Sequence, residues 1–266
     1  MTSHYARDHG SYVLGSLFGD GRKFPYPKAL YAVEDTLRFY VSGKPDATVI
    51  DFFSGSGTTA HAVMRLNRQD GGRRQCISVT NNEVGADEQA KLRKQGLRPG
   101  DPDWERWGIC DYITKPRIEA AITGQTPDGV PIKGEYKFTD EFPMAEGFEE
   151  NAAFFTLTYE TPRRVAYHRA FDAIAPMLWL KAGSRGRIIK DVDKGFDVSD
   201  VYAVIADLDK APAVLDQLTE AHRMVFIVTD DDRRFQMLVR DLPPHVEPVR
   251  LYESYLRNFE INTGRE

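Results

Sequence analysis

The amino-acid sequence predicts an α/β fold for a globular protein. Two stretches of the 266-residue chain, one near each end, alternate β-branched or apolar runs with segments whose apolar residues have helical spacing. Apolar residues make up 41% of the chain and charged residues 28%, which is typical of a protein that buries a full core. The sequence shows no internal repeat and no low-complexity segment. Together these observations predict two parallel-sheet regions in one chain.

The first α/β stretch contains one strand–helix–strand unit. Residues 48–53 are β-branched and aromatic, which is typical of a buried strand, and the glycine-rich turn 54–57 follows them. Thr58 or Thr59 can cap the next helix. The elements expected in order are a helix over 29–39, a strand over 48–53, a helix from 58 or 59, a strand over 75–80 and a helix over 87–95. The two strands should be parallel, with a right-handed crossover.

The middle of the chain separates this unit from a second one. Prolines interrupt residues 99–147, so we expect a linker or a cover for the sheet there, with a short helix over 117–122. The later elements expected are a strand over 153–159, a helix over 166–180, a strand over 201–208, a helix over 211–221, a strand over 223–229, a helix over 233–242 and a strand over 246–252. The predicted parts of the chain are therefore residues 1–98, 99–147 and 148–266.

The sharpest feature of the sequence is the run from Asp51 to Thr59, which reads DFFSGSGTT. A strand ends in a tight turn, and the turn leads into the N-terminus of a helix. Gly55 and Gly57 let a ligand approach the backbone closely and allow dihedral angles that other residues avoid. The N–H groups of the first helical turn have no partner within the helix, so they point at whatever binds there. The turn therefore suits a phosphate or the carboxylate of an amino-acid-like ligand.

Three classes of ligand compete for this turn. A P-loop needs Gly-Lys followed by Ser or Thr, but Gly57 is followed by Thr58. A dinucleotide site matches loosely, through Gly55, Gly57 and Ala60. An S-adenosylmethionine site explains Asp51, because an acid at the end of the strand suits a ligand with an ammonium group and would repel a pyrophosphate. A strand–helix turn without any ligand is the remaining alternative.

The motif resembles that of the permuted class of DNA amino-methyltransferases, and within it the modification subunits of type III restriction systems. The similarity is carried by DFFSGSGTT at 51–59, with FPYPK at 24–28 before it and RQCISVTNNE at 74–83 after it. It extends more loosely through 147–159 and 178–186. The resemblance implies a Rossmann-like, S-adenosylmethionine-dependent methyltransferase sheet, present here in part, followed by a smaller α/β region towards the C-terminus. Residues 1–98 would then form the cofactor-binding half.

The resemblance also implies roles for residues around the turn. Asp51 and the turn over 54–59 would hold the methionine part of the cofactor. Phe52 and Phe53 would line the pocket. Lys28 would close the methionine side, although a solvated lysine at the start of a helix explains it equally well.

The end of the second strand departs from the family pattern. An acid usually binds the ribose hydroxyls at this place, but here Thr80 occupies it. Asn82 or Glu83 would then supply the contact. The full set of expected cofactor-binding residues is Lys28, Asp51, Phe52, Phe53, Ser54, Gly55, Ser56, Gly57, Thr58, Thr59, Thr80, Asn82 and Glu83.

The sequence lacks the catalytic tetrapeptide of this family. Amino-methyltransferases use an [Asp/Asn/Ser]-Pro-Pro-[Tyr/Phe/Trp] loop to accept hydrogen bonds from the target amine and to stack on the flipped base. The one Pro-Pro pair, Pro243-Pro244, lies between Leu242 and His245, far from the strand predicted over 48–53. In the family this loop would lie upstream of residue 1. We therefore expect a C-terminal fragment, a truncated gene product or one half of a split enzyme, without catalytic residues of its own.

The resemblance implies an intact enzyme that methylates the N6 amine of adenine at a specific DNA sequence. The expected partners are DNA and either an upstream methyltransferase half or a restriction or helicase subunit. The alternative is a non-catalytic cofactor-binding or assembly module of a restriction-modification or phage-defence complex, which the missing tetrapeptide favours. An NAD-dependent oxidoreductase is a further alternative, but Thr80 stands where that class has an acid.

Other kinds of site have little support. The two cysteines, Cys76 and Cys110, give no disulfide framework and indicate reduced thiols. The histidines form no pair at ligand spacing, and the acidic run 230–232 is expected to be solvated, so no metal site is predicted. With a net charge of −5, any DNA contact would use a local patch. The sequence has neither a run of ~20 apolar residues nor a signal-peptide pattern, so we expect a cytoplasmic protein with no membrane contact.

Overall fold

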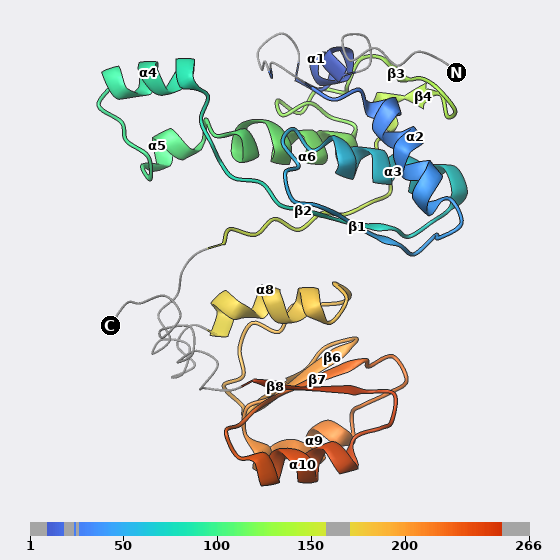
Figure 1. The fold of residues 1–266 in the computed structure, drawn as a ribbon, viewed down its shortest axis with the longest axis vertical. Helices are drawn as coiled ribbons and strands as arrows, with labels where there is room; N and C mark the ends of the chain where they lie inside the picture. The colour runs from blue at the N-terminus through green and yellow to red at the C-terminus, as the bar shows by residue number, and fades with distance from the viewer. Residues whose placement is uncertain (1–9, 19–23, 25–26, 158–170, 252–266) are drawn as a thin grey trace. The chain divides into compact units, whose positions relative to one another are not determined.

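The structure is a computed structural model that describes residues 10–18, 24, 27–157 and 171–251. The chain divides into two compact units, Met1–Phe154 and Phe155–Glu266 (Figure 1). Both units combine helices with β-sheet, so the α/β class predicted from the sequence is confirmed. Among the described residues, no helix combines the length and the apolar character needed to cross a membrane.

A parallel pair of strands, β1 (Thr48–Asp51) and β2 (Gln75–Ser78), forms the sheet of the first unit. Thr48 pairs with Gln75 and Asp51 pairs with Ser78, and α3 (Thr58–Asp70) connects the strands as the sequence predicts. The antiparallel pair β3 and β4 spans Glu135–Tyr136 and Phe142–Pro143. Further helical elements are α1 (Tyr12–Phe18), α2 (Leu30–Val41), α4 (Ala86–Lys94), α5 (Pro102–Glu105), the π-helix η3 (Cys110–Thr114), α6 (Lys115–Thr123) and the 3-10 turn η4 (Met144–Glu146).

The core of the first unit surrounds α3. This helix contacts α2, β2 and α6, and it is buried on nearly all sides, polar residues such as His61 and Arg65 included. Ile118 of α6, Tyr136 of β3 and Phe142 of β4 pack into the same core. All three belong to the segment 99–147, for which the sequence left linker and cover as alternatives. This segment therefore builds part of the first core, and the first compact unit extends to residue 154.

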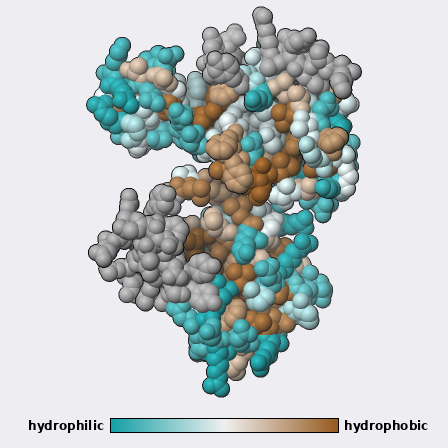
Figure 2. Space-filling model, viewed as in Figure 1, coloured by the Kyte–Doolittle hydropathy of each residue, from teal (hydrophilic) through white to brown (hydrophobic). Residues whose placement is uncertain are grey.

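One face of β1 is exposed to solvent. Side chains alternate between the two faces of a strand, and the burial of β1 alternates from residue to residue in the same way. Ile50 has 53% of its surface exposed, and Phe52, just beyond the strand, has 65%. Apolar residues reach the surface on the visible face of this unit (Figure 2). The sheet of the first unit is therefore half-buried on one face and leaves apolar groups exposed on the other.

The second unit contains a four-stranded sheet in the order β5-β6-β7-β8. The strands are β5 (Phe196–Val198), β6 (Tyr202–Ile205), β7 (Met224–Val228) and β8 (Glu247–Leu251), with β5 antiparallel to β6 and the others parallel. The helix α8 (Phe171–Lys181) covers one face, and α9 (Ala211–Leu215) and α10 (Asp232–Asp241) cover the other (Figure 1). Tyr202 and Val204 pack towards α8, whereas Ala203 and Ile205 pack towards α9 and α10.

Several predicted elements of the second stretch differ from the observed ones. The helix expected over 211–221 ends at Leu215, and β5 was not predicted. Residues 153–157 form no strand, while residues 158 and 159 lie outside the described part of the chain. In the acidic run 230–232, the Asp231 side chain caps α10 by accepting the N–H of Arg234 at 3.0 Å. This carboxylate therefore has a structural partner at the start of the helix.

Candidate functional site

Backbone hydrogen bonds close the turn that follows β1. The Gly57 N–H donates to Ser54 O at 2.8 Å, and the Ser54 N–H donates to Val79 O, just after β2, at 3.1 Å. The Val79 N–H in turn donates to Asp51 O at 2.8 Å. These bonds tie the ends of the two parallel strands together. The turn therefore starts from a well-defined edge of the sheet.

The two glycines of the turn serve different purposes. Gly55 has φ +50°, and a Cβ atom there would meet Phe53 O at 3.8 Å, so the space beside it is open. Gly57 has φ +77° and stands at the N-cap of α3. A Cβ atom at Gly57 would lie 3.2 Å from Thr114 Cγ2 and 3.6 Å from Ile118 Cγ1. Gly57 therefore allows α6 to pack against the turn, whereas Gly55 leaves room for a ligand.

The half-buried Asp51 carboxylate organises the turn. Its Oδ1 accepts the Phe53 N–H at 3.1 Å, and its Oδ2 accepts the Thr59 hydroxyl at 2.6 Å. Each carboxylate oxygen has a second lone pair, so Asp51 can still accept from a ligand. The Ser54 hydroxyl is buried and has no hydrogen-bond partner within the described residues. A ligand in the turn would meet one negative group, and an unpaired hydroxyl lies buried beside it.

The aromatic pair and the lysine expected at the site lie on the surface. Phe53 has 94% of its surface exposed, more than the 65% of its neighbour Phe52. Lys28 is also exposed and lies two residues before α2. Of the FPYPK run, residues 25 and 26 lie outside the described part of the chain. The two phenyl rings flank the turn but are not enclosed by it.

Beyond β2, the three expected ribose contacts have different surroundings. The Asn82 amide nitrogen donates to Glu105 O at 2.7 Å, and its amide oxygen accepts the Asp111 N–H at 3.1 Å. The Thr80 hydroxyl donates to the neighbouring backbone carbonyl at 3.1 Å, and Glu83 is exposed. Asn82 therefore joins the loop after β2 to the segment that leads into α6, which leaves Glu83 the more accessible of the two alternatives.

A buried arginine of α6 contacts the turn from the core side. Arg117 Nη1 donates to Thr58 Oγ1 at 2.8 Å, and it lies 3.1 Å from Ser56 Oγ and 3.2 Å from Ser56 O. Thr114, just before α6, donates its hydroxyl to Gly55 O at 2.5 Å. The turn thus has two faces, one held by η3 and α6 and the other open.

His61, in the second turn of α3, is fully buried beside this arginine. Arg117 Nε donates to His61 Nδ1 at 3.4 Å, so Nδ1 is the acceptor and Nε2 carries the proton that faces Tyr136 Oη at 2.7 Å. Burial, together with the charges of Arg117 and Arg65, lowers the pKa of His61 well below its usual value. Burial also raises the pKa of the Tyr136 hydroxyl. Both rings are therefore neutral, and they connect α3 to β3.

The neutral state of His61 predicts acid sensitivity of the first unit. The unfolded chain binds a proton at this histidine below about pH 6.5, whereas the folded chain does not. His61 therefore contributes stability that is present above this pH and declines below it by about 1.4 kcal/mol for each pH unit. Chemical denaturation between about pH 7 and about pH 5 measures this decline. The His61→Gln variant should show a shallower decline, and an unchanged slope would contradict the assignment.

The sequence did not indicate Thr114, Arg117 or Tyr136 as residues of this site. Arg117 lies 59 residues from Thr58, and Tyr136 lies 75 residues from His61. The one available signal was that Arg117 and Ile118 follow Thr114 by three and four residues, which places both one helical turn after Thr114 on the same face. This spacing indicates a binding role only once the structure shows that α6 packs against the turn.

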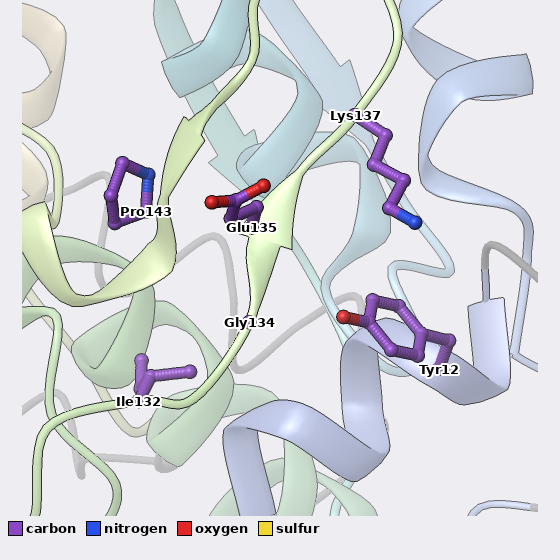
Figure 3. Close-up of a pocket in the computed structure, with 6 residues that line it drawn as sticks. All are labelled: Tyr12, Ile132, Gly134, Glu135, Lys137 and Pro143. Carbon is purple, nitrogen blue, oxygen red and sulfur yellow. The ribbon is translucent and has the colours of Figure 1, made fainter.

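The first unit also has a shallow hollow away from the turn. It has a volume of about 460 Å³ and is lined by Tyr12, Ile132, Gly134, Glu135, Lys137 and Pro143 (Figure 3). Lys137 reaches towards the Tyr12 ring, with its Nζ 5.9 Å from the ring centroid. None of the cofactor-binding residues expected from the sequence lines this hollow, so we base the functional argument on the turn.

The first unit is an α/β unit in which an acid at the end of a parallel strand lies beside the start of a helix. Residues 3–96 match the family model of DNA methylases. The chain is thus similar to N6-adenine methyltransferases, and the recognition predicted from the motif is confirmed.

Curated relatives make this similarity more specific. The Mod subunit of the type III restriction-modification enzyme StyLTI of Salmonella typhimurium strain LT2 is 47% identical over 75 residues, 28% of this chain and 11% of the relative. The type II methyltransferase M.KpnI of Klebsiella pneumoniae is 39% identical over 80 residues, 30% of this chain and 18% of the relative. The Mod subunit of EcoP15I of Escherichia coli is 31% identical over 210 residues, 72% of this chain and 29% of the relative. The chain therefore spans less than a third of the length of each of these relatives.

Proposed function

We propose that this chain carries the S-adenosylmethionine-binding part of a site-specific DNA adenine-N6 methyltransferase. The observation that supports this most strongly is the turn from Asp51 to Thr59, where a half-buried carboxylate stands beside the start of α3. The carboxylate suits an ammonium group, and the first amides of the helix suit a carboxylate. The methionine end of the proposed cofactor carries both groups. In this proposal β1, α3 and β2 belong to a Rossmann-like methyltransferase sheet, and residues 1–98 form its cofactor half.

Each residue near the turn then has a part in holding the cofactor. The open side of Gly55 admits the ligand, and the Ser54 hydroxyl, which is buried and unpaired among the described residues, would supply a polar contact once it rotates towards that side. The exposed rings of Phe52 and Phe53 offer apolar faces for the adenosyl part. Glu83, exposed after β2, would accept hydrogen bonds from the ribose hydroxyls. The remaining proposed contacts are Lys28, Ser56, Gly57, Thr58, Thr59, Thr80 and Asn82.

The chain's own residues would act by positioning. S-adenosylmethionine, when bound, supplies an activated methyl group on its sulfonium centre. The turn holds the ligand by its charged end, and the strand ends beneath it set the direction in which the ligand extends. Orientation of this kind lowers the barrier of a group transfer without any proton transfer by the protein. No general base needs to be assigned within this turn.

The relatives support proposals about substrate and partners. The type III Mod subunits are named as parts of restriction-modification enzymes. We infer that this chain works on DNA and together with a further methyltransferase segment or a restriction subunit. The alternative is a non-catalytic assembly module. The one Pro-Pro pair of this sequence, Pro243-Pro244, lies beyond α10 and lacks the flanking residues of the catalytic tetrapeptide.

Calorimetric titration with S-adenosylmethionine tests the proposed cofactor, with NAD as the matched control ligand. We expect saturable binding of S-adenosylmethionine and none of NAD, because Asp51 would repel a pyrophosphate. Binding of NAD in place of S-adenosylmethionine would contradict the proposal. Transfer of a labelled methyl group to adenine-containing DNA, in the presence of a segment that carries the tetrapeptide, distinguishes the enzyme from the assembly module. Binding without any transfer would favour the module.

A further inference from the structure

The burial of Arg117 has no electrostatic explanation among its neighbours. Its side chain is fully buried, and no carboxylate contacts it within the part of the chain that the structure describes. Burial lowers the pKa of Arg117 to about 10, which reflects the unfavourable transfer of its charge from water. Its Nη2 atom is buried without a hydrogen-bond partner. A buried guanidinium without a carboxylate partner lowers the stability of the fold. Its contacts with the turn therefore indicate a role beyond stability.

Two other buried arginines of the same unit show the usual arrangement. Arg65 Nε donates to the fully buried Glu34 at 2.5 Å. Arg74 donates to the Asp70 carboxylate at 2.7 Å and 2.8 Å and to Val41 O at 2.9 Å. Both have a carboxylate partner, whereas Arg117 donates to a backbone carbonyl, two hydroxyls and the neutral His61. Arg117 is therefore distinguished by what it contacts, not by its depth.

The contacts of Arg117 and Thr114 orient the backbone of the turn. Thr114 attracts the Gly55 carbonyl towards η3 and α6, and Arg117 attracts the Ser56 carbonyl in the same direction. In a planar trans peptide the C=O and the following N–H point in opposite directions. With the Gly55 carbonyl held on the core side, the Ser56 N–H points to the other side of the turn. The positive guanidinium behind the turn also adds to the favourable field for an anion at the start of α3.

We propose that Arg117 is a positioning residue that, with Thr114, holds the turn over residues 55–58 in the shape that receives the charged end of the ligand. Arg117 acts from behind the turn, through the Ser56 carbonyl and the Thr58 hydroxyl, and does not touch the ligand. The identity of that ligand rests on the proposed function. The claim that Arg117 and Thr114 fix the shape of the turn does not rest on the proposed function, because it follows from their contacts alone.

Substitution of Arg117 and of Arg74 by methionine separates positioning from general stability. Methionine keeps much of the apolar volume but removes the charge and the donors. We expect Arg117→Met to weaken S-adenosylmethionine binding by about tenfold or more, since it removes contacts from a charged donor. Arg74→Met, whose partner Asp70 is the last residue of α3, should lower stability and leave the dissociation constant unchanged. Equal dissociation constants for the folded Arg117→Met variant and the unsubstituted chain would overturn the proposal.

Amide hydrogen exchange gives a second measurement that needs no ligand. In Arg117→Met, the amides of residues 54–60 should exchange faster than in Arg74→Met at matched overall stability. Should Arg117→Met fail to fold, Thr114→Val removes the hydroxyl that holds the Gly55 carbonyl and keeps the methyl group against Gly57. It should show the same selective exchange, and unchanged exchange in a folded variant would contradict the inference. Faster exchange in a chain that never binds S-adenosylmethionine would overturn the proposed function alone.

Discussion

Replacement of Glu34 by alanine is expected to lower the free energy of unfolding of the first unit by about 3–5 kcal/mol. Glu34 is fully buried and accepts hydrogen bonds from Arg65 at 2.5 Å and from Arg38 at 2.6 Å. It also accepts from Gln69 Nε2 at 2.7 Å, so one carboxylate joins α2 to α3. Without it, the fully buried guanidinium of Arg65 keeps carbonyl and aromatic neighbours and no carboxylate among the described residues. An unpaired buried charge is the reason for the large effect.

Urea unfolding followed by tryptophan fluorescence measures this loss. A Trp179→Phe background leaves Trp104 and Trp107, both in the first unit, so the signal reports that unit. Asp103→Ala is the matched control, because its ion pair with Arg106 at 2.6 Å is exposed and should contribute at most about 1 kcal/mol. A loss for Glu34→Ala no larger than that of the control would show that the buried network is not what stabilises the unit.

The Asp51→Asn variant is expected to fold and to lose affinity for S-adenosylmethionine by about 10- to 100-fold. The amide oxygen can still accept the Phe53 N–H, and the Thr59 hydroxyl can rotate to accept from the amide nitrogen. The shape of the turn is therefore kept while its negative charge is removed. Because the proposed ligand presents an ammonium group to this carboxylate, the loss should appear in the affinity and not in the stability.

Thr59→Val provides the control for this substitution. It removes the 2.6 Å hydrogen bond to Asp51 and leaves the charge in place. Calorimetric titration of both variants should show a smaller loss for Thr59→Val than for Asp51→Asn. The reverse order would mean that the carboxylate acts by shaping the turn and not by binding an ammonium group.

The sequence predicted the elements whose signals are local. The strand predicted over 48–53, which ends at Asp51 in the structure, the glycine turn and the helix from Thr58 follow one another without interruption, and each has its own composition. The N-cap was assigned wrongly to Thr58 or Thr59, because Gly57 occupies it in a left-handed conformation. The helix over 211–221 was predicted too long, since apolar spacing continues beyond the point where α9 ends at Leu215.

The core side of the turn could not be predicted, because it is made by distant residues. In the run KPRIEAAIT, Arg117 looks like a surface charge of a short helix. It is buried only because the π-helix η3 and α6 bring it against the turn. Glu34 and Arg65 lie 31 residues apart, and the sequence of each helix alone gives no indication that the two side chains pair inside the core. Polar residues that form hydrogen bonds with residues of another helix or strand produce no periodic pattern in the sequence.

The parallel pairing of β1 and β2 has a consequence for how the chain folds. Thr48 pairs with Gln75, and the whole of α3 lies between them in the sequence. The two strands therefore cannot form from a short-range hairpin contact. The pairing should therefore form late, after α3 is in place. Until then both edges of β1 stay open beside Ile50, whose side chain is exposed even in the folded unit. During refolding this open strand can pair with another molecule, so the yield should fall as protein concentration rises.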